Sequence, residues 1–289
     1  MLKIGAQDVD LRIGSQEAKA YLGSVLVQDP SPAGSWDLTQ LSYQSNNFSV
    51  ATQASSPEDV GFNSSGSKMY ALDSLTAKIY EYDLSSAWDV TTAVVNSNEL
   101  DVSGQDSAMT GFYIRNDGLK LYAVGQTNDK IYQYTLSVAF DISTATFDSV
   151  EFSVLTQEAN VSGVFMQDDG SRVFITGNNS VHSYTLGTDW DISTAVFETT
   201  FSVAGQDGSV RGIAMKTDGA KMYICGNTNN RIFQYTLSTP WLLSTASYDS
   251  VSLFVGSEDL TPTDVTFRDN GSILYMVGLS TDTVYAYEL

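Results

Sequence analysis

The sequence predicts an all-β fold made of five copies of one four-stranded unit, and three observations lead to this prediction. Tyr (16), Phe (13) and Gly (22) are plentiful, whereas charged residues make up only 17% of the 289 residues. This composition favours short strands and tight turns over helices. Short apolar strands also recur along the chain. A turn glycine recurs with them, in steps of 52, 52, 49 and 52 residues, at Gly66, Gly118, Gly170, Gly219 and Gly271.

Each repeat contains the same elements in the same order. Asp or Asn precedes four of the five glycines, as is typical of hairpin turns that need a positive φ. A short apolar strand follows the turn, as in residues 120–125, and then come a polar loop and a third strand, as in residues 131–136. An aromatic–Asp cassette and a fourth strand complete the repeat. The cassettes are Trp88-Asp89, Phe140-Asp141 and Trp190-Asp191, with Trp241-Leu242 as a degenerate copy.

The second strand of the repeat is apolar on both faces. Leu121 and Ala123 alternate with Tyr122 and Val124, so neither face suits contact with water. A sandwich strand alternates apolar and polar residues, whereas a middle strand of a propeller blade is covered on both sides by neighbouring blades. The sequence therefore predicts a five-bladed β-propeller with four-stranded antiparallel blades.

The last repeat ends at Leu289 on its third strand, so its cassette and fourth strand must come from elsewhere. Trp36-Asp37, followed by residues 41–50, has the form of the missing pieces. We expect this N-terminal segment to pair with residues 284–289 and close the ring, which would remove both open sheet edges. The alternative is an open solenoid of five modules, for which the sequence shows no capping ends.

Residues 1–28 lie outside the repeat and have the short alternating pattern of a small β extension. Residues 29–35 contain Pro, Ser and Gly, as linkers do, and residues 36–289 make up the propeller. About 25 residues cannot bury much core by themselves. Two interpretations of residues 1–28 therefore stay open: strands that pack on the propeller rim, or an element that docks on another protein.

The composition also limits partners and chemistry. Asp and Glu number 34 against 14 Lys and Arg, and a net charge of −20 repels phosphate backbones and anionic lipid, so we expect no nucleic-acid partner. No apolar run approaches a membrane span, and the first five residues do not resemble a signal peptide, so we expect no membrane insertion. Cys225 and His182 are the only residues of their types, which argues against a disulfide, a thiolate or multi-histidine metal site and a Ser-His-Asp triad. We predict no cofactor, no metal and packing roles for both residues.

Residues 190–195 (WDISTA) and 131–137 (IYQYTLS), with the Asp–Gly turns between them, resemble a propeller repeat of bacteriophage virion proteins and marine environmental sequences. Residues 13–15 and 21–24 are similar to the N-terminal segments of phage tail and other structural proteins. The resemblance implies a non-enzymatic component of a virion, in the tail, a fibre or a capsid decoration, that is made in the host cytoplasm and contacts host surface glycan. Residues 1–28 would then attach it to other virion proteins, and a homo-oligomer is compatible with this role.

A ring of polar residues is the candidate ligand site. Thirteen residues before each turn glycine lies Gln or Glu, and an acidic residue follows in four of five copies. Their amides and carboxylates can bond sugar hydroxyls or coordinate Ca²⁺. Alternatively, each residue fastens its own crossover loop by bonding backbone groups. The ring comprises Gln53, Gln105, Asp106, Gln157, Glu158, Gln206, Asp207, Glu258 and Asp259.

Two other functions remain as alternatives: a carbohydrate-binding adhesin or lectin of cellular origin, and a five-bladed glycoside hydrolase. The hydrolase would use Asp59 and Asp264, which stand seven residues before their turn glycines where the other copies have Gly. Nothing else in the repeat converges on this pair, so we predict that the protein is not an enzyme. The cassette tryptophans could stack on sugars, but their presence in successive repeats favours packing between blades.

Overall fold

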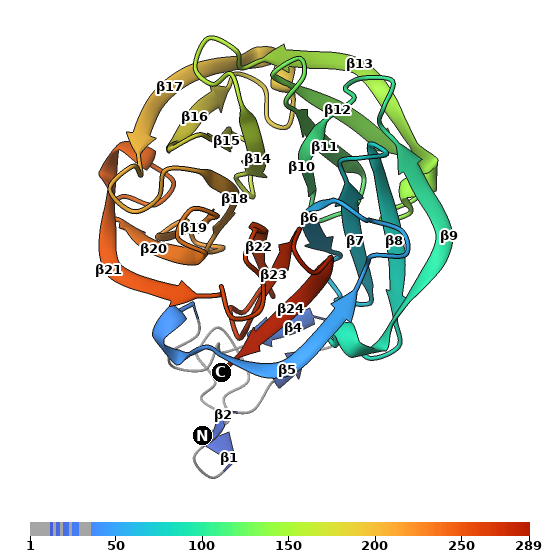
Figure 1. Ribbon diagram of the computed structural model, residues 1–289, viewed down its shortest axis with the longest axis vertical. Helices are drawn as coiled ribbons and strands as arrows, with labels where there is room; N and C mark the ends of the chain where they lie inside the picture. Colours follow the sequence, from blue (N-terminus) through green and yellow to red (C-terminus); the bar gives the residue numbers. More distant parts are fainter. Residues whose placement is uncertain (1–11, 14–15, 18–19, 23–24, 29–35) are drawn as a thin grey trace.

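The computed structural model describes residues 12–13, 16–17, 20–22, 25–28 and 36–289. Residues 36–289 form a closed ring of five four-stranded antiparallel blades (Figure 1), which confirms the predicted five-bladed propeller. The first strand of each blade lies nearest the central axis and the fourth lies on the outer rim (Figure 1).

The blades follow one another along the chain. Blade 1 consists of β6 (Pro57–Phe62), β7 (Lys68–Asp73), β8 (Lys78–Leu84) and β9 (Ala93–Asp101). Blade 2 consists of β10 (Met109–Ile114), β11 (Lys120–Gly125), β12 (Lys130–Leu136) and β13 (Ala145–Ser153). Blade 3 consists of β14 (Val161–Met166), β15 (Arg172–Gly177), β16 (Ser180–Leu186) and β17 (Ala195–Ser202). Blade 4 consists of β18 (Val210–Met215), β19 (Lys221–Gly226), β20 (Arg231–Leu237) and β21 (Ala246–Phe254).

Blade 5 is built from both ends of the ring, as the sequence predicted. Its strands are β22 (Pro262–Phe267), β23 (Ile273–Gly278), β24 (Thr283–Glu288) and β5 (Ser42–Ser49). β5 runs antiparallel to β24, with Phe48 opposite Val284 and Asn47 opposite Tyr285, and the two lie side by side at the foot of Figure 1. The ring is therefore closed by hydrogen bonds between its first and last strands.

The core is divided among the gaps between blades. Each of the five hydrophobic clusters takes its residues from two adjacent blades. Leu121 and Ala123 pack toward blade 1, whereas Tyr122 and Val124 pack toward blade 3, and all four side chains are fully buried. The predicted double coverage of the second strand is confirmed.

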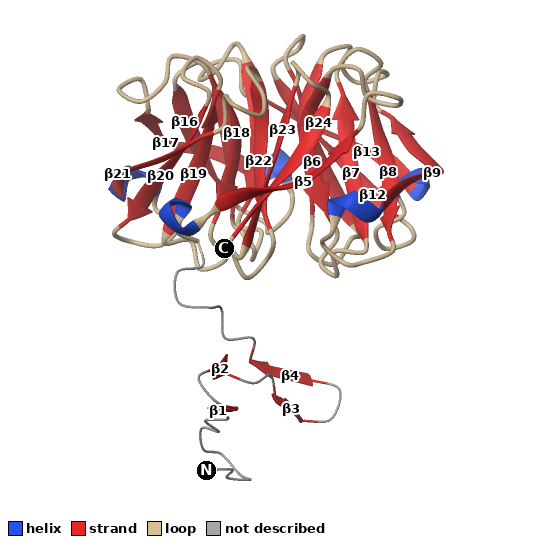
Figure 2. Cartoon of the chain, turned by 60° about the horizontal axis from the view of Figure 1, so that its bottom comes forward, coloured by secondary structure: helices blue, strands red, loops and turns tan. Residues whose placement is uncertain are grey.

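The aromatic cassettes connect successive blades. The ring of Trp36 fills the space over Gly271, and its carbonyl accepts a hydrogen bond from the hydroxyl of Tyr223 in blade 4. Likewise, Tyr275 of blade 5 donates to the Trp88 carbonyl of blade 1 at 2.6 Å. The cassettes thus pack between blades. A single-turn 3-10 helix follows each one, on the rim in Figure 2: η1 (Leu38–Gln40), η2 (Val90–Thr92), η3 (Ile142–Thr144), η4 (Ile192–Thr194) and η5 (Leu243–Thr245).

Four short strands precede the ring. β1 (Arg12–Ile13) pairs with β2 (Gln16–Glu17), and β3 (Ala20–Leu22) pairs with β4 (Val25–Gln28). None of these strands pairs with a blade. The predicted linker, residues 29–35, lies outside the described residues, as do the residues of the predicted docking segment 1–28 that are not in these four strands. Among the residues that the structure describes, no helix has the length and apolar character needed to cross a bilayer.

Candidate functional site

Four acidic residues of the candidate ring are buried in the loops that lead from one blade to the next: Asp106, Glu158, Asp207 and Asp259. Asp106 is 2% exposed, and its carboxylate accepts hydrogen bonds from the backbone N–H groups of Ala108 at 2.9 Å, Thr127 at 3.3 Å and Asn128 at 2.8 Å. One side chain therefore joins the crossover loop to the loop between the second and third strands of blade 2. Asp207 and Asp259 make the same three kinds of contact in blades 4 and 5.

A glycine at the end of the second strand makes room for each of these carboxylates. A methyl group on Gly125 would overlap the Asp106 carboxylate. The same holds for three further pairs: Gly177 with Glu158, Gly226 with Asp207, and Gly278 with Asp259. The small residue and the carboxylate thus form a complementary pair in four blades.

Blade 1 has the same arrangement with the two residues exchanged. Ala54 stands at the position of the carboxylate, and Asp73 ends the second strand where the other blades have glycine. The Asp73 carboxylate accepts the N–H groups of Ser56 at 2.7 Å and Thr76 at 3.0 Å, which belong to the same two loops. In blade 3, Glu158 accepts the Asn160 N–H at 2.9 Å and the Asn178 side-chain amide at 2.6 Å. All five blades therefore fasten these loops with a carboxylate, which comes from the crossover loop in blades 2 to 5 and from the end of the second strand in blade 1.

The Gln and Glu residues of the ring bind tyrosine hydroxyls of their own blades. Tyr134 donates to Gln105 Oε1 at 2.8 Å, and Tyr287 donates to Glu258 Oε2 at 2.9 Å. Gln157 and Gln206 accept from Tyr184 and Tyr235 in the same way. The copy in blade 1 departs from this pattern, because the hydroxyl of Tyr82 is buried without a hydrogen-bond partner and does not reach Gln53.

These contacts match the loop-fastening interpretation of the ring. The carboxylate oxygens of Asp106, Asp207 and Asp259 already accept hydrogen bonds from the chain, which explains why acidic residues recur there. A ligand-binding role for the nine ring residues stays a prediction.

The one cysteine of the sequence, Cys225, and its one histidine, His182, are both buried. Cys225 is fully buried in the cluster between blades 4 and 5, and burial raises the pKa of its thiol well above the ordinary value. His182 is 4% exposed and lies in blade 3 with Nδ1 2.9 Å from Thr200 Oγ1 and Nε2 3.5 Å from Glu158 Oε2. The contact between His182 and Glu158 could not be predicted from the sequence, since Glu158 lies in the crossover loop before β14 and His182 lies on β16.

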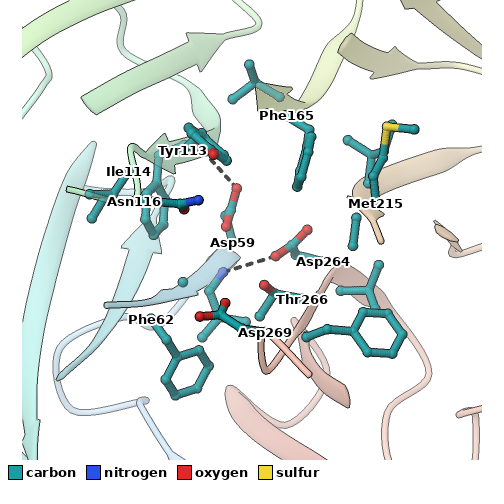
Figure 3. A pocket seen from close by; sticks show the side chains of 18 of the residues that line it. Asp59, Phe62, Tyr113, Ile114, Asn116, Phe165, Met215, Asp264, Thr266 and Asp269 are labelled. Carbon is teal, nitrogen blue, oxygen red and sulfur yellow. Dashed lines mark hydrogen bonds between the residues drawn. The ribbon is translucent and has the colours of Figure 1, made fainter. Parts of the chain in front are cut away.

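A cavity of about 140 Å³ lies on the central axis between the inner strands (Figure 3). Its lining brings together Asp59 and Asp264, the pair that the hydrolase alternative singles out, and each of them is 6% exposed. Asp59 Oδ2 accepts the N–H of Phe112 at 2.7 Å, and Asp264 Oδ2 accepts the N–H of Val60 at 3.3 Å. Each carboxylate thus connects its own inner strand to that of the next blade.

Burial changes the acidity of this pair. It raises the pKa of Asp59 to about 7, and burial together with the neighbouring Asp59 carboxylate raises the pKa of Asp264 well above its ordinary value. Two carboxyl groups that share a dry site cannot both ionise easily, so the pair retains a proton near neutral pH. Glu58 lies nearby, 3.7 Å from Arg211 of blade 4, and burial raises its pKa to about 7 although the guanidinium opposes that shift.

Glycines occupy the equivalent position in blades 2, 3 and 4 and let the inner strands approach closely. A Cβ on Gly163 would lie 2.7 Å from the Arg211 carbonyl oxygen, and one on Gly111 would lie 2.9 Å from that of Ser162. In blades 1 and 5 the aspartate side chain instead accepts an N–H of the next inner strand. The geometry therefore accounts for Asp59 and Asp264 as bridges between blades.

A second hollow, here called the blade 4 groove, lies on the outer side of blade 4 and measures about 510 Å³. It is lined by Gly205, Gln206, Asn229, Arg231, Phe233, Tyr248, Ser252 and Phe254. Of these residues, only Gln206 belongs to the ring predicted from the sequence. The signal that could have found the others is the departure of blade 4 from the repeat at Ser252 and Phe254.

Comparisons with known proteins identify the fold alone. The sequence matches no protein-family profile and no curated protein. A protein from Bacteroides fragilis NCTC 9343 named as a "putative 6-phosphogluconolactonase" superposes with a TM-score of 0.55 at 12% identity, covering 80% of each chain. A protein of the same description from Bacteroides uniformis ATCC 8492 gives 0.50 at 11% identity over 79% of this chain and 65% of its own.

A functionally unknown protein from Desulfotomaculum acetoxidans DSM 771 gives a TM-score of 0.46 at 15% identity, covering 77% of this chain. The present chain spans 62% of that protein's length. The likeness to the two Bacteroides proteins, at 11–12% identity, concerns the fold alone and carries no activity over to this chain.

Proposed function

We propose that this propeller is a non-enzymatic structural or interaction protein of a phage virion, held in the tail, a fibre or a capsid decoration. Residues 1–28 attach it to other virion proteins, and the propeller contacts glycan on the host surface. The virion role rests on the resemblance of the WDISTA and IYQYTLS segments to virion repeats.

One structural observation supports an attachment role for the N-terminal residues. The ring is completed by Trp36 and β5, so nothing before residue 36 is needed to close it. The described strands β1 to β4 pair only with one another. A segment that the propeller does not use for its own sheets is available to bind a partner.

The use of the buried carboxylates supports the non-enzymatic part of the proposal. Asp106, Asp207 and Asp259 fasten loops, and Asp59 and Asp264 bridge inner strands. Each has a structural role that explains its burial, and structural hydrogen-bond networks perturb carboxyl pKa values just as catalytic sites do.

Fractionation of the source culture tests the virion role. Particles are banded in a density gradient after nuclease treatment, and an antibody against the propeller locates the chain. We expect the chain to band with the nuclease-protected genome. A variant that lacks residues 1–28, supplied during infection, should fold but stay at the top of the gradient. Absence of the full chain from the particle band would refute the proposal.

A glycoside hydrolase is the second candidate, and the raised pKa of Asp59 favours it, because a carboxyl group that holds its proton near pH 7 can serve as a general acid. A panel of chromogenic α- and β-glycosides, assayed with the wild type and with the Asp59→Asn, Asp264→Asn double variant, tests this candidate. Turnover by the wild type that disappears in the double variant would establish the hydrolase and overturn the non-enzymatic proposal.

A further inference from the structure

The blade 4 groove differs from its surroundings in charge. Arg231 is its only charged lining residue, although the chain as a whole carries a net charge of −20. Within the described part of the chain, no carboxylate lies within salt-bridge distance of this guanidinium. Its Nη1 donates instead to Ser252 Oγ at 3.0 Å, and its Cζ lies 5.3 Å from the centre of the Phe254 ring.

The equivalent cations in other blades are neutralised. Lys130 in blade 2 forms an ion pair with Glu151, and Lys78 in blade 1 forms one with Glu99. Strand register places Ser252 of blade 4 at the position of Glu151, since Ser252 lies opposite Phe233 as Glu151 lies opposite Tyr132. Blade 4 has therefore lost the carboxylate and kept the cation.

An aromatic side chain stands where the other blades have a small or acidic residue. Phe254 lies opposite Arg231, and the equivalent positions hold Ser49, Asp101, Ser153 and Ser202. The Phe254 side chain is 48% exposed, and Gly256 leaves the room that its ring occupies. Phe254 therefore presents an aromatic face to solvent beside the guanidinium of Arg231.

Two amides complete the polar rim. Gln206 accepts from Tyr235 through Oε1, and its NH2 group has no partner within the described residues. Asn229 donates through Nδ2 to the Gln206 carbonyl at 2.7 Å, which leaves its own side-chain oxygen as an acceptor. The groove thus offers a guanidinium, an amide donor, an amide acceptor and two partly exposed rings, those of Tyr248 and Phe254.

We propose that the blade 4 groove binds an acidic saccharide. The carboxylate or sulfate group of the sugar pairs with Arg231, whose planar guanidinium suits such anions, and the sugar ring lies against Phe254. Gln206 and Asn229 bind sugar hydroxyls. This inference rests on the glycan contact in the proposed function and names its ligand class and its location.

The overall negative charge does not prevent this interaction. Charges that lie farther than about 8 Å away are largely screened at physiological ionic strength. Asp249, on the adjacent strand β21, is paired with Lys221 at 3.0 Å. Asp207, which follows Gln206 in the chain, is 2% exposed, and its carboxylate accepts the backbone N–H groups of Thr228 and Asn229. A local guanidinium without a counter-ion therefore governs the charge that a bound ligand meets.

Calorimetric titration of the full chain tests the proposal with three tetrasaccharides of equal length: one that contains uronic acid, one that is sulfated but has no carboxyl group, and one that is neutral. We expect at least one acidic saccharide to bind about 10-fold or more tightly than the neutral one, which corresponds to one good charge-assisted contact. The comparison of the two acidic probes identifies the anionic group. Equal or stronger binding of the neutral saccharide would overturn the proposal. A Glu-rich peptide is titrated in parallel, and tighter binding of this peptide than of either acidic saccharide would also overturn it.

Two variants separate binding from folding. Ser252→Glu restores the ion pair found in blades 1 and 2, so the fold should keep its stability while acidic saccharides bind about 10-fold more weakly. Ser202→Glu adds the same charge to blade 3 and should leave binding within about twofold of the wild type. Wild-type affinity in the Ser252→Glu protein, with an unchanged Tm, would show that Arg231 is not the anion site.

The outcomes distinguish this inference from the proposed function. A chain that bands with particles but binds none of the acidic probes contradicts the blade 4 site and leaves the virion role standing. A chain that binds an acidic saccharide through Arg231 but is missing from particles supports the site and contradicts the virion role.

Discussion

Asp73 Oδ1 accepts a hydrogen bond from the backbone N–H of Ser56 at 2.7 Å, and through this contact blade 1 fastens its loops from the end of its second strand, whereas the other blades use a residue of the crossover loop. In every blade one carboxylate occupies the space between the crossover loop and the end of the second strand. In blade 2 it belongs to Asp106, and Gly125 leaves room for it. In blade 1 it belongs to Asp73, and the small Ala54 stands at the position of Asp106. This exchange suggests that a carboxylate is required at this place in the fold.

The first prediction concerns that exchange. Asp73→Gly leaves the N–H groups of Ser56 and Thr76 without an acceptor and should lower the free energy of unfolding by about 1–3 kcal/mol. Ala54→Asp alone should also destabilise the protein, because two carboxylates would compete for one space. The double variant should recover most of the loss, as measured by urea unfolding. Strictly additive effects of the two substitutions would contradict the shared space.

The second prediction concerns the contact between the two ends of the ring. Gly271 has a φ of +70°, and a methyl group there would overlap the Trp36 ring. Gly271→Ala should therefore lower the free energy of unfolding by about 2–4 kcal/mol. Gly104→Ala serves as the control, because a methyl group there meets nothing within 4 Å. Equal Tm values for the two variants would contradict this account.

The third prediction is a dependence of stability on pH. Asp59 titrates near pH 7 in the fold, whereas an unfolded aspartate titrates near pH 4. The folded chain therefore holds an additional proton between these values. The stabilisation is complete below about pH 4 and is lost as the pH rises through about 7. Unfolding free energy should thus fall between pH 5 and pH 8.

Asp59→Asn removes that titration while it keeps an oxygen acceptor for the Phe112 N–H. The free energy of unfolding of the variant minus that of the wild type should rise by about 2 kcal/mol from pH 5 to pH 8. Urea unfolding of both proteins at both pH values measures this change. Asp117→Asn is the control, since Arg115 lowers the pKa of Asp117 and its titration lies outside this range. Identical pH profiles for the wild type and Asp59→Asn would rule out the proposed titration.

The fourth prediction compares two truncations. Removal of residues 1–28 should leave a monomeric propeller with the wild-type Tm, because no blade strand pairs with that segment. Removal of residues 1–50 also takes away Trp36 and β5 and leaves β24 as an exposed edge, which invites pairing with other molecules. Size-exclusion chromatography with light scattering should show aggregates of the shorter chain only. A monomer of wild-type stability without residues 1–50 would contradict the closure.

Local repetition explains why the fold could be predicted. The turn glycines and cassettes repeat within short stretches of sequence, and the count of five, together with the incomplete last copy, was sufficient to predict the partner of β24. The meeting of Asp59 and Asp264 also follows from the repeat, because both occupy one repeat position in blades that become neighbours when the ring closes.

Contacts that depend on departures from the repeat could not be predicted. Asp73 and Ala54 each look like an ordinary substitution until the structure shows that the crossover loop and the end of the second strand share one space. The groove contact between Arg231 and Phe254 depends on the register of β20 and β21. All five blades share an irregularity between their third and fourth strands, which in blade 4 falls between Gln234 and Tyr235. An irregularity of this kind leaves no reliable mark in the sequence, so the partner of Arg231 on the fourth strand could not be assigned.

The pairing of β5 with β24 has a consequence for synthesis in the cell. The earliest strand of the ring is translated long before its partner, which reaches completion only when Glu288 has left the ribosome. Until then the ring is incomplete, and β5 at its start has no partner strand and can pair with other molecules. Stalled or prematurely released chains should therefore be the species that chaperones and proteases encounter, whereas in the finished ring β5 and β24 cover each other.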